Sequence, residues 1–118
     1  MESNQRLRKS SDFDRISKFG RVLRVDSWLI IAYYSNDLGY FRWGATISKK
    51  VGNAVLRNKL KRWIKTYFRE NEMGFNEGLD LNFIFKPQKD IYQSLNFKNF
   101  KLKLNPTLEK LKKNKNVH

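Results

Sequence analysis

The chain has 118 residues, with 25 Lys or Arg against 11 Asp or Glu and a formal net charge of +14. This length fits one domain with a modest core and is too short for two. The absence of cysteine excludes disulfides and thiolate metal sites, and the excess of positive charge favours a partner with a dense anionic surface, nucleic acid foremost.

The first part of the chain predicts one short helix followed by strands. Segment 10–19 opens with Ser and Asp residues that can cap a helix, so we expect a helix there. A brief strand is expected at 22–25, and the β-branched and aromatic residues of 27–35 predict a buried strand. Turn residues at 36–39 lead into 40–48, which we expect to return as the hairpin partner of 27–35.

The second half predicts helices around one further strand. Residues 53–70 have the period of an amphipathic helix, and the alternation of 79–86 predicts a strand. The Lys-rich segment 90–113 is helical in period, but Pro106 within it must break, kink or restart the helix. Asn105 before it suits an N-cap, which favours a final helix that starts at this pair.

The order helix, two or three strands, helix, strand, helix predicts an α+β fold, an α/β sandwich with one sheet. Without an internal repeat or a Pro/Gly/Ser-rich linker, we expect residues 1–118 to form a single domain. We expect order to be lowest in the basic segment 1–9 and in the Lys-rich tail 111–118. Gly44 indicates a bulge or a close approach of another group.

The predicted helix at 53–70 has two dissimilar faces. An apolar stripe that we expect to face the core consists of Leu56, Leu60, Trp63, Ile64 and Tyr67. A row of cations at i+4 spacing on a roughly opposite face consists of Arg57, Lys61, Lys65 and Arg69. A solvated charged face is the ordinary explanation of such a row. However, like charges at this spacing cost about 0.2–0.5 kcal/mol per pair, and no acid occurs between Arg42 and Arg69, so we expect an external polyanion to offset the repulsion.

The turn before this helix adds a second feature. Lys49 and Lys50 stand beside Gly52, and the helix that follows begins with outward-facing N–H groups at the positive end of its dipole. A glycine before a helix is also a common connector without function. Together with two lysines, it indicates a phosphate-binding site.

The stretch KKVGNAVLRNKLKRWIK, residues 49–65, resembles the signature of the protein subunit of bacterial ribonuclease P, in which an Arg-Asn-Arg motif follows Gly-Asn-Ala-Val. The motif stands here as Arg57-Asn58-Lys59. Lysine in place of the second arginine keeps the charge and loses the bidentate geometry. The N-terminal RLRKSSDF, residues 6–13, resembles the start of the same family, so the resemblance covers nearly the whole chain.

The resemblance implies a four-stranded sheet packed with about three helices in the order α-β-β-β-α-β-α, with a left-handed βαβ crossover. It also implies an RNA-binding subunit of an endoribonuclease that removes the 5′ leader of precursor tRNA, with the catalytic groups in the RNA subunit. The implied partners are ribonuclease P RNA and precursor tRNA, without a membrane or an obligate protein partner. The implied cofactor is Mg²⁺, bound mainly by the RNA subunit and the substrate. No residue of this chain is expected to be catalytic or to bind metal.

Carried over by position, the resemblance implies two binding regions. The RNA subunit would be bound by Lys49, Lys50, Asn53, Arg57, Asn58, Lys59, Lys61, Arg62, Lys65 and Arg69. The leader would be bound, in a cleft between the sheet and the first helix, by Arg6, Arg8, Lys9, Phe13 and Tyr33. Phe13 is equally explained as a core residue at helical spacing. Two positions depart from the family: its second cleft aromatic is Ser17 here, and its cleft tyrosine aligns with Ile31, with Tyr33 two residues later on the same face.

Three other functions fit part of the sequence. Another RNA-binding protein, such as a small ribosomal protein, would share the charge and fold class but not the spacing of Gly-Asn-Ala-Val and Arg-Asn-Lys. A membrane-surface module would use a basic amphipathic helix, although Leu60 and Trp63 are well placed for a core. A self-sufficient nuclease would need catalytic side chains, whereas the one histidine is the terminal His118 and the acids lack metal-ligand spacing. We expect a soluble cytoplasmic protein, because no signal peptide is evident and no stretch approaches the roughly 18 apolar residues of a membrane span.

Overall fold

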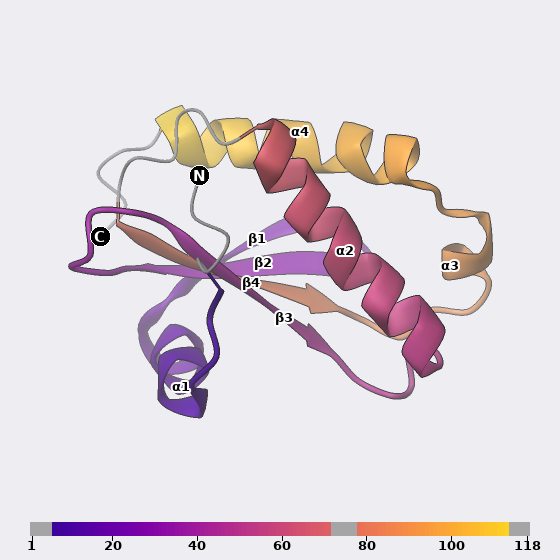
Figure 1. The fold of residues 1–118 in the computed structure, drawn as a ribbon, viewed down its shortest axis with the longest axis horizontal. Helices are drawn as coiled ribbons and strands as arrows, with labels where there is room; N and C mark the ends of the chain where they lie inside the picture. Colours follow the sequence, from indigo (N-terminus) through magenta and orange to yellow (C-terminus); the bar gives the residue numbers. More distant parts are fainter. Residues whose placement is uncertain (1–5, 72–77, 114–118) are drawn as a thin grey trace.

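The structure, a computed structural model, describes residues 6–71 and 78–113 (Figure 1). The elements of this part of the chain are α1 (Ser10–Phe19), β1 (Arg21–Asp26), β2 (Leu29–Ser35), β3 (Arg42–Ile47), α2 (Ala54–Glu70), β4 (Leu79–Phe85), α3 (Ile91–Ser94) and α4 (Phe97–Lys113). The predicted order is confirmed, with the short helix α3 added to it. Residues 1–5 and 114–118, for which we expected low order, lie outside the described residues. Residues 111–113, which belong to the same predicted tail, end α4, and Leu111 is buried.

β4 lies inside a four-stranded sheet with the strand order β1-β2-β4-β3. β1 and β2 form an antiparallel hairpin, β2 also pairs antiparallel with β4, and β3 pairs parallel with β4. The predicted hairpin between 27–35 and 40–48 is therefore wrong, and residues 27–28 form the turn between β1 and β2. The reason lies in burial: six of the seven residues of β4 are buried, and a strand buried on both faces takes a central position.

Helices cover the two faces of the sheet unequally (Figure 1). α2 and α4 lie over one face, and the main core between them and the sheet includes Ile31, Phe83, Ile64 and Phe100. α1 packs on the opposite face, called here the α1 face, over a smaller cluster of Leu7, Ile16 and Ala32. The sheet therefore separates two different surfaces of the protein.

α4 is one continuous helix that contains Pro106. The predicted restart at Asn105 and Pro106 is therefore wrong. Pro106 removes one backbone donor, but Leu104 and Leu108 on either side of it are fully buried, and this burial holds the helix together across the proline. Asn105 is not an N-cap, because it lies inside α4; its Oδ1 accepts a hydrogen bond of 2.7 Å from the Tyr67 hydroxyl of α2.

α1 has the predicted bounds, but it begins differently from our expectation. Its N-cap residue is Lys9, and no side chain caps the helix. The Ser and Asp residues of the first turn are therefore not its caps. Asp12 instead is buried against the sheet, with 6% of its surface exposed.

Candidate nucleic-acid interface

α2 buries the predicted apolar stripe between the sheet and α4. The buried residues are Leu60, Trp63, Ile64, Tyr67 and Phe68, and Leu56 is half-buried. Sequence reasoning missed Phe68, although its spacing of four from Ile64 places it on the same stripe. The centroid of its ring lies 4.8 Å from that of the Phe41 ring.

The outward surface of α2 and the loop before it carry cations that have no acidic partner among the described residues. This surface, called here the basic face, consists of Lys49, Lys50, Arg57, Asn58, Lys61, Arg62, Lys65 and Arg69. All of these residues are exposed except Arg57 and Lys61, which are half-buried. The first turn of α2 has no acid, and no cation of the basic face forms an ion pair within residues 6–71 and 78–113. Within these residues the charges repel one another without a counter-ion, which suits an external polyanion.

Side chains of α2 fix the loop that precedes the helix. Asn53 is the N-cap, and its Oδ1 accepts a hydrogen bond of 2.9 Å from the Leu56 N–H. Arg57 Nε donates a hydrogen bond of 3.1 Å to the Gly52 carbonyl. Gly52 lies so close to Leu56 that a Cβ at position 52 would collide with Leu56 Cδ2. Arg57 therefore supports the loop as well as contributing charge to the basic face.

Lys59, the third residue of the motif, contacts the protein itself. Its Nζ lies 5.2 Å from the ring centroid of Trp63, which in turn packs against Phe97 and Phe100 of α4. A cation over an indole ring is stabilised by about 0.5–1 kcal/mol at exposed sites. The structure thus places Lys59 at the margin of the basic face, beside the contact between α2 and α4.

Phe13 lies half-buried on the α1 face. Its ring occupies the space over Gly44 of β3, where a Cβ would lie only 2.6 Å from Phe13 Cζ. The close approach predicted at Gly44 is therefore confirmed. Because the ring is only partly covered, Phe13 both packs against the sheet and presents an aromatic surface beside the exposed residues Arg8 and Lys9.

An ionic network anchors α1 to the sheet. Arg42 of β3 forms a bidentate pair with Asp80 of β4, with distances of 2.9 Å and 2.7 Å, and its Nη1 lies 3.4 Å from Asp12 of α1. Arg15 of α1 lies 3.2 Å from Asp12 and 3.8 Å from Asp80. Asn36 Nδ2 donates a further hydrogen bond of 2.7 Å to Asp80. The pair with Asp80 raises the pKa of Arg42 above its ordinary value.

Two residues predicted for the leader cleft lie elsewhere. Tyr33 belongs to the main core and is 7% exposed, so it faces α2 and α4 instead of α1. Arg6 lies with its guanidinium carbon 4.2 Å from the ring centroid of Trp43, which also belongs to the main core. Burial and the nearby charge of Arg8 lower the pKa of Arg6. Both placements in a cleft on the α1 face are therefore wrong.

Sequence reasoning missed Tyr34, which lies on the α1 face where Tyr33 was expected. Its ring lies 6.1 Å from that of Phe19, a residue that is 65% exposed at the end of α1. Val22, in the neighbouring strand, is also exposed. The signal that could have identified Tyr34 is strand alternation, because it lies two residues after Ala32, which packs under α1.

The part of the chain that the structure describes contains neither a cluster of metal-ligand side chains nor a membrane-spanning helix. In residues 6–71 and 78–113, no three side chains of the types His, Cys, Asp or Glu gather closely enough to hold a metal ion. Among the helices described, none combines the length and the hydrophobicity that crossing a membrane requires.

Sequence comparison identifies relatives over most of the chain. The family model for Ribonuclease P matches residues 1–112. A ribonuclease P protein component from Alkaliphilus metalliredigens is 41% identical over 87 residues, which cover 74% of this chain and 78% of that protein. One from Staphylococcus epidermidis is 41% identical over 69 residues, which cover 58% of this chain and 60% of that protein.

Solved structures show the same fold. The RNase P protein of Staphylococcus aureus aligns with a TM-score of 0.79 and 29% identity over 91% of this chain and 94% of that one. The RNase P protein of Thermotoga maritima aligns with a TM-score of 0.77 and 32% identity over 89% of this chain and 96% of that one. A third structure, of an S. aureus RNase P protein mutant with defective mRNA degradation activity, aligns with a TM-score of 0.80 and 30% identity over 95% of this chain and 92% of that one.

Proposed function

Because the chain belongs to the ribonuclease P protein family, we propose that its two faces bind two different RNAs within that ribonucleoprotein. The protein is an RNA-binding component of an endoribonuclease that processes the 5′ ends of tRNA. We propose that the catalytic RNA subunit binds the basic face, and that the 5′ leader of precursor tRNA binds the α1 face.

The observation that carries this proposal is the basic face, whose cations form no ion pair with any acid in the part of the chain that the structure describes. Four residues of helix correspond to a rise of about 6 Å, so the row from Arg57 to Arg69 presents a positive charge at regular intervals along α2. Phosphates placed against this row would relieve its repulsion and release their own counter-ions. The loop before α2 extends the face with Lys49 and Lys50, which are held beside the fixed Gly52 backbone.

The α1 face suits a single strand better than a folded RNA. Phe13, Phe19 and Tyr34 provide aromatic surface there, and Arg8 and Lys9 provide charge next to Phe13. Each base stacked on such a ring contributes about 1–3 kcal/mol to binding without requiring a particular sequence. Because the sheet separates the α1 face from the basic face, the leader and the RNA subunit can be bound at the same time.

We propose that the Mg²⁺ ions of the reaction are held mainly by the RNA subunit and the substrate. This proposal follows from the family to which the chain belongs. The role of this chain is then to bind and orient RNA, which lowers the Mg²⁺ concentration that correct cleavage needs. We also propose a cytoplasmic location, where bacterial precursor tRNA is made.

The test adds the purified protein to a bacterial ribonuclease P RNA at low Mg²⁺ and measures correct 5′ cleavage of precursor tRNA. We expect the wild-type protein to stimulate cleavage. Arg62→Ala should weaken binding of the RNA subunit, whereas Phe13→Ala should weaken binding of substrates with a leader and spare leaderless ones. If the wild-type protein does not stimulate this cleavage, the proposal is refuted.

A second candidate is cleavage of RNA by the polypeptide alone. One structural neighbour, the S. aureus protein mutant, is described by its defective mRNA degradation activity. The same purified protein, incubated with precursor tRNA or mRNA in the absence of any RNA subunit, tests this function. This function would be favoured by cleavage that persists through further purification and disappears when a residue of this chain is substituted.

A further inference from the structure

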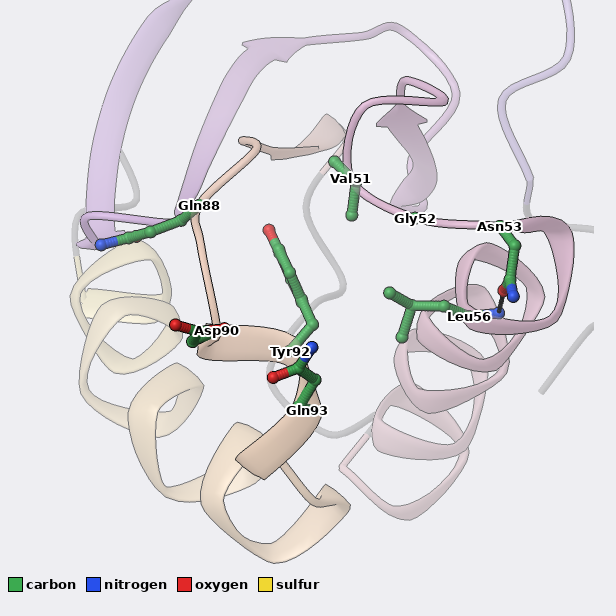
Figure 2. Close-up of a pocket in the computed structure, with 8 residues that line it drawn as sticks. All are labelled: Val51, Gly52, Asn53, Leu56, Gln88, Asp90, Tyr92 and Gln93. Carbon is green, nitrogen blue, oxygen red and sulfur yellow. Dashed lines mark hydrogen bonds between the residues drawn. The ribbon is translucent and has the colours of Figure 1, made fainter.

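A pocket of about 350 Å³ lies between the loop before α2 and the segment that contains α3 (Figure 2). Its lining residues are Val51, Gly52, Asn53, Leu56, Gln88, Asp90, Tyr92 and Gln93. Figure 2 shows the Tyr92 ring standing across the pocket from Val51 and Leu56. The volume is at the small end of the range for ligand sites, roughly 300–1,000 Å³, and fits one small group with apolar faces.

Both walls of the pocket are held in place. On one side, the hydroxyl of Tyr92 lies 2.6 Å from the Lys86 carbonyl and 3.2 Å from the Trp28 carbonyl, and the residue is buried. On the other side, the Asn53 cap and the bond from Arg57 to the Gly52 carbonyl fix the loop. A ligand that enters the pocket therefore meets preformed surfaces and orders little of the protein, which favours binding.

Four exposed lysines lie next to lining residues in the chain, whereas the lining itself includes an acid. Lys49 and Lys50 directly precede Val51 in the chain, Lys86 and Lys89 flank Gln88, and all four lysines are exposed. Asp90 lines the pocket itself. An anionic group is thus favoured at the rim and disfavoured inside, as suits a nucleotide whose phosphates stay outside while its neutral base enters.

Two further features favour the binding of a nucleotide at this pocket. Asp90 has a φ of 65°, and it is the non-glycine residue with positive φ among those described. Such a conformation costs free energy and is often retained at binding sites. Val55, in the first turn of α2 beside Leu56, leaves 76% of its surface exposed, which gives a strand crossing the helix start an apolar contact.

We infer that this pocket receives one unstacked nucleobase of the ribonuclease P RNA. The base lies between the Tyr92 side and the Val51 and Leu56 side, and its flanking phosphates contact the lysines of the rim. The pocket adjoins the basic face at the start of α2, so the strand that follows the basic face reaches it directly. The inference rests on the proposed function, because it assumes that the basic face binds the RNA subunit.

The test fills the pocket without touching its buried walls. Gln93 is exposed and lines the pocket, so Gln93→Trp should occupy the space of the base and lower the affinity for ribonuclease P RNA about tenfold at fixed salt. Ser94→Trp is the matched control, because Ser94 is the next residue of α3 and lines a different cavity with Asp26 and Leu95. We expect the control to bind RNA within about twofold of the wild type, and circular dichroism confirms that both variants are folded.

Equal affinities of the two tryptophan variants would overturn the inference. If Arg62→Ala still weakens binding in that case, the pocket alone is rejected, whereas loss of both effects rejects the proposed function as well. Cross-linking gives a second measurement that does not depend on tryptophan. Because the chain has no cysteine, Gln93→Cys can carry a single azidophenacyl group. We expect this group to cross-link one nucleotide of ribonuclease P RNA and not precursor tRNA, and a scattered pattern or a cross-link to the tRNA contradicts the inference.

Discussion

Replacing Arg42 by alanine should loosen α1 from the sheet and leave the basic face intact. Arg42 is the central cation of the ionic network, with a bidentate pair to Asp80 and a contact of 3.4 Å to Asp12. The side chains of Asp80 and Asp12 are 2% and 9% exposed. In the variant, water has little access to these two carboxylates, so their negative charges remain close together with less compensation.

The loss of stability in Arg42→Ala depends on the contacts that Asp12 and Asp80 keep. Removing one partner of a buried ion pair costs about 3–5 kcal/mol. The lower end applies here, because Arg15 still lies 3.2 Å from Asp12 and Asn36 still donates to Asp80. We therefore expect the free energy of unfolding to fall by about 3 kcal/mol, which lowers the Tm of a chain of this length by roughly 10–15 °C. Arg42→Lys keeps the charge and loses the bidentate geometry, so it should cost about 1–2 kcal/mol.

Two assays separate stability from function. Thermal unfolding followed by circular dichroism gives the Tm of each variant. At a temperature where Arg42→Ala is folded, we expect KM for precursor tRNA with a leader to rise about fivefold, because Phe13 is carried by the loosened helix and one stacked base contributes about 1 kcal/mol or more. The affinity for the RNA subunit should stay within about twofold, because α2 packs on the opposite face of the sheet.

An unchanged Tm would refute the reasoning about the network, and an equal rise of KM for a leaderless substrate would refute the link to the leader. A double-mutant cycle with Asp12→Ala measures the contact directly. If Arg42 acts on α1 through Asp12, the double variant should lose less free energy of unfolding than the two single variants lose in sum. The difference, which is the coupling energy, should be about 0.5–3 kcal/mol. Additive costs would show that Arg42 stabilises only the pairing of β3 with β4.

Three further predictions concern the loop, the α1 face and the core. Gly44→Ala places a methyl group against the ring of Phe13, so it should lower the free energy of unfolding by about 1–3 kcal/mol and weaken leader binding. A variant with the stability and the leader affinity of the wild type would contradict this packing of Phe13 on Gly44. Arg57→Ala should weaken RNA-subunit binding and reduce the slope of log K against log salt by about one phosphate contact, and an unchanged slope would remove Arg57 from the interface. Burial raises the pKa of Tyr67 and of Tyr92 to about 12. In the unfolded chain these tyrosines ionise near pH 10, so the stability conferred by their neutral forms is present below about pH 10 and is lost as the pH rises towards 12. Tyr92→Phe should reduce this loss of stability, which a series of unfolding curves at increasing pH measures.

The parts of the fold that depend on local pattern could be predicted from the sequence. α2 has its predicted stripe and begins within one residue of the predicted start at 53, because the period of 3.6 that reveals the stripe acts within a few residues. The bounds of α1 and β4 also follow from local pattern, although the predicted side-chain cap of α1 does not form. The basic face could also be predicted, since the helical period determines which residues share a face once the helix exists.

The pairing of strands could not be predicted in this way. β3 follows β2 in the chain after a short turn, which favours a hairpin, yet β4 lies between them because its residues bury both faces. Tyr33 and Tyr34 show the same difficulty on a smaller scale. Neighbouring residues of a strand point to opposite faces, and the sequence of β2 alone does not tell which face α1 will cover. The helix across Pro106 likewise depends on burial supplied by other elements.

The placement of the acids explains how a chain with a net charge of +14 can fold and still present a bare basic face. Asp12 and Asp80 join the network under α1, Glu70 lies 3.6 Å from Lys101, and Asp26 lies 3.0 Å from Lys103. Each of these pairs connects different elements of the protein, and none of them involves a cation between 49 and 69. Hydrogen bonds from Ser27 and Lys103 lower the pKa of Asp26, so this pair persists into mildly acidic solution. The few acids therefore reduce repulsion within the fold at the contacts between elements. The cations of the basic face keep their mutual repulsion, which an RNA can relieve on binding.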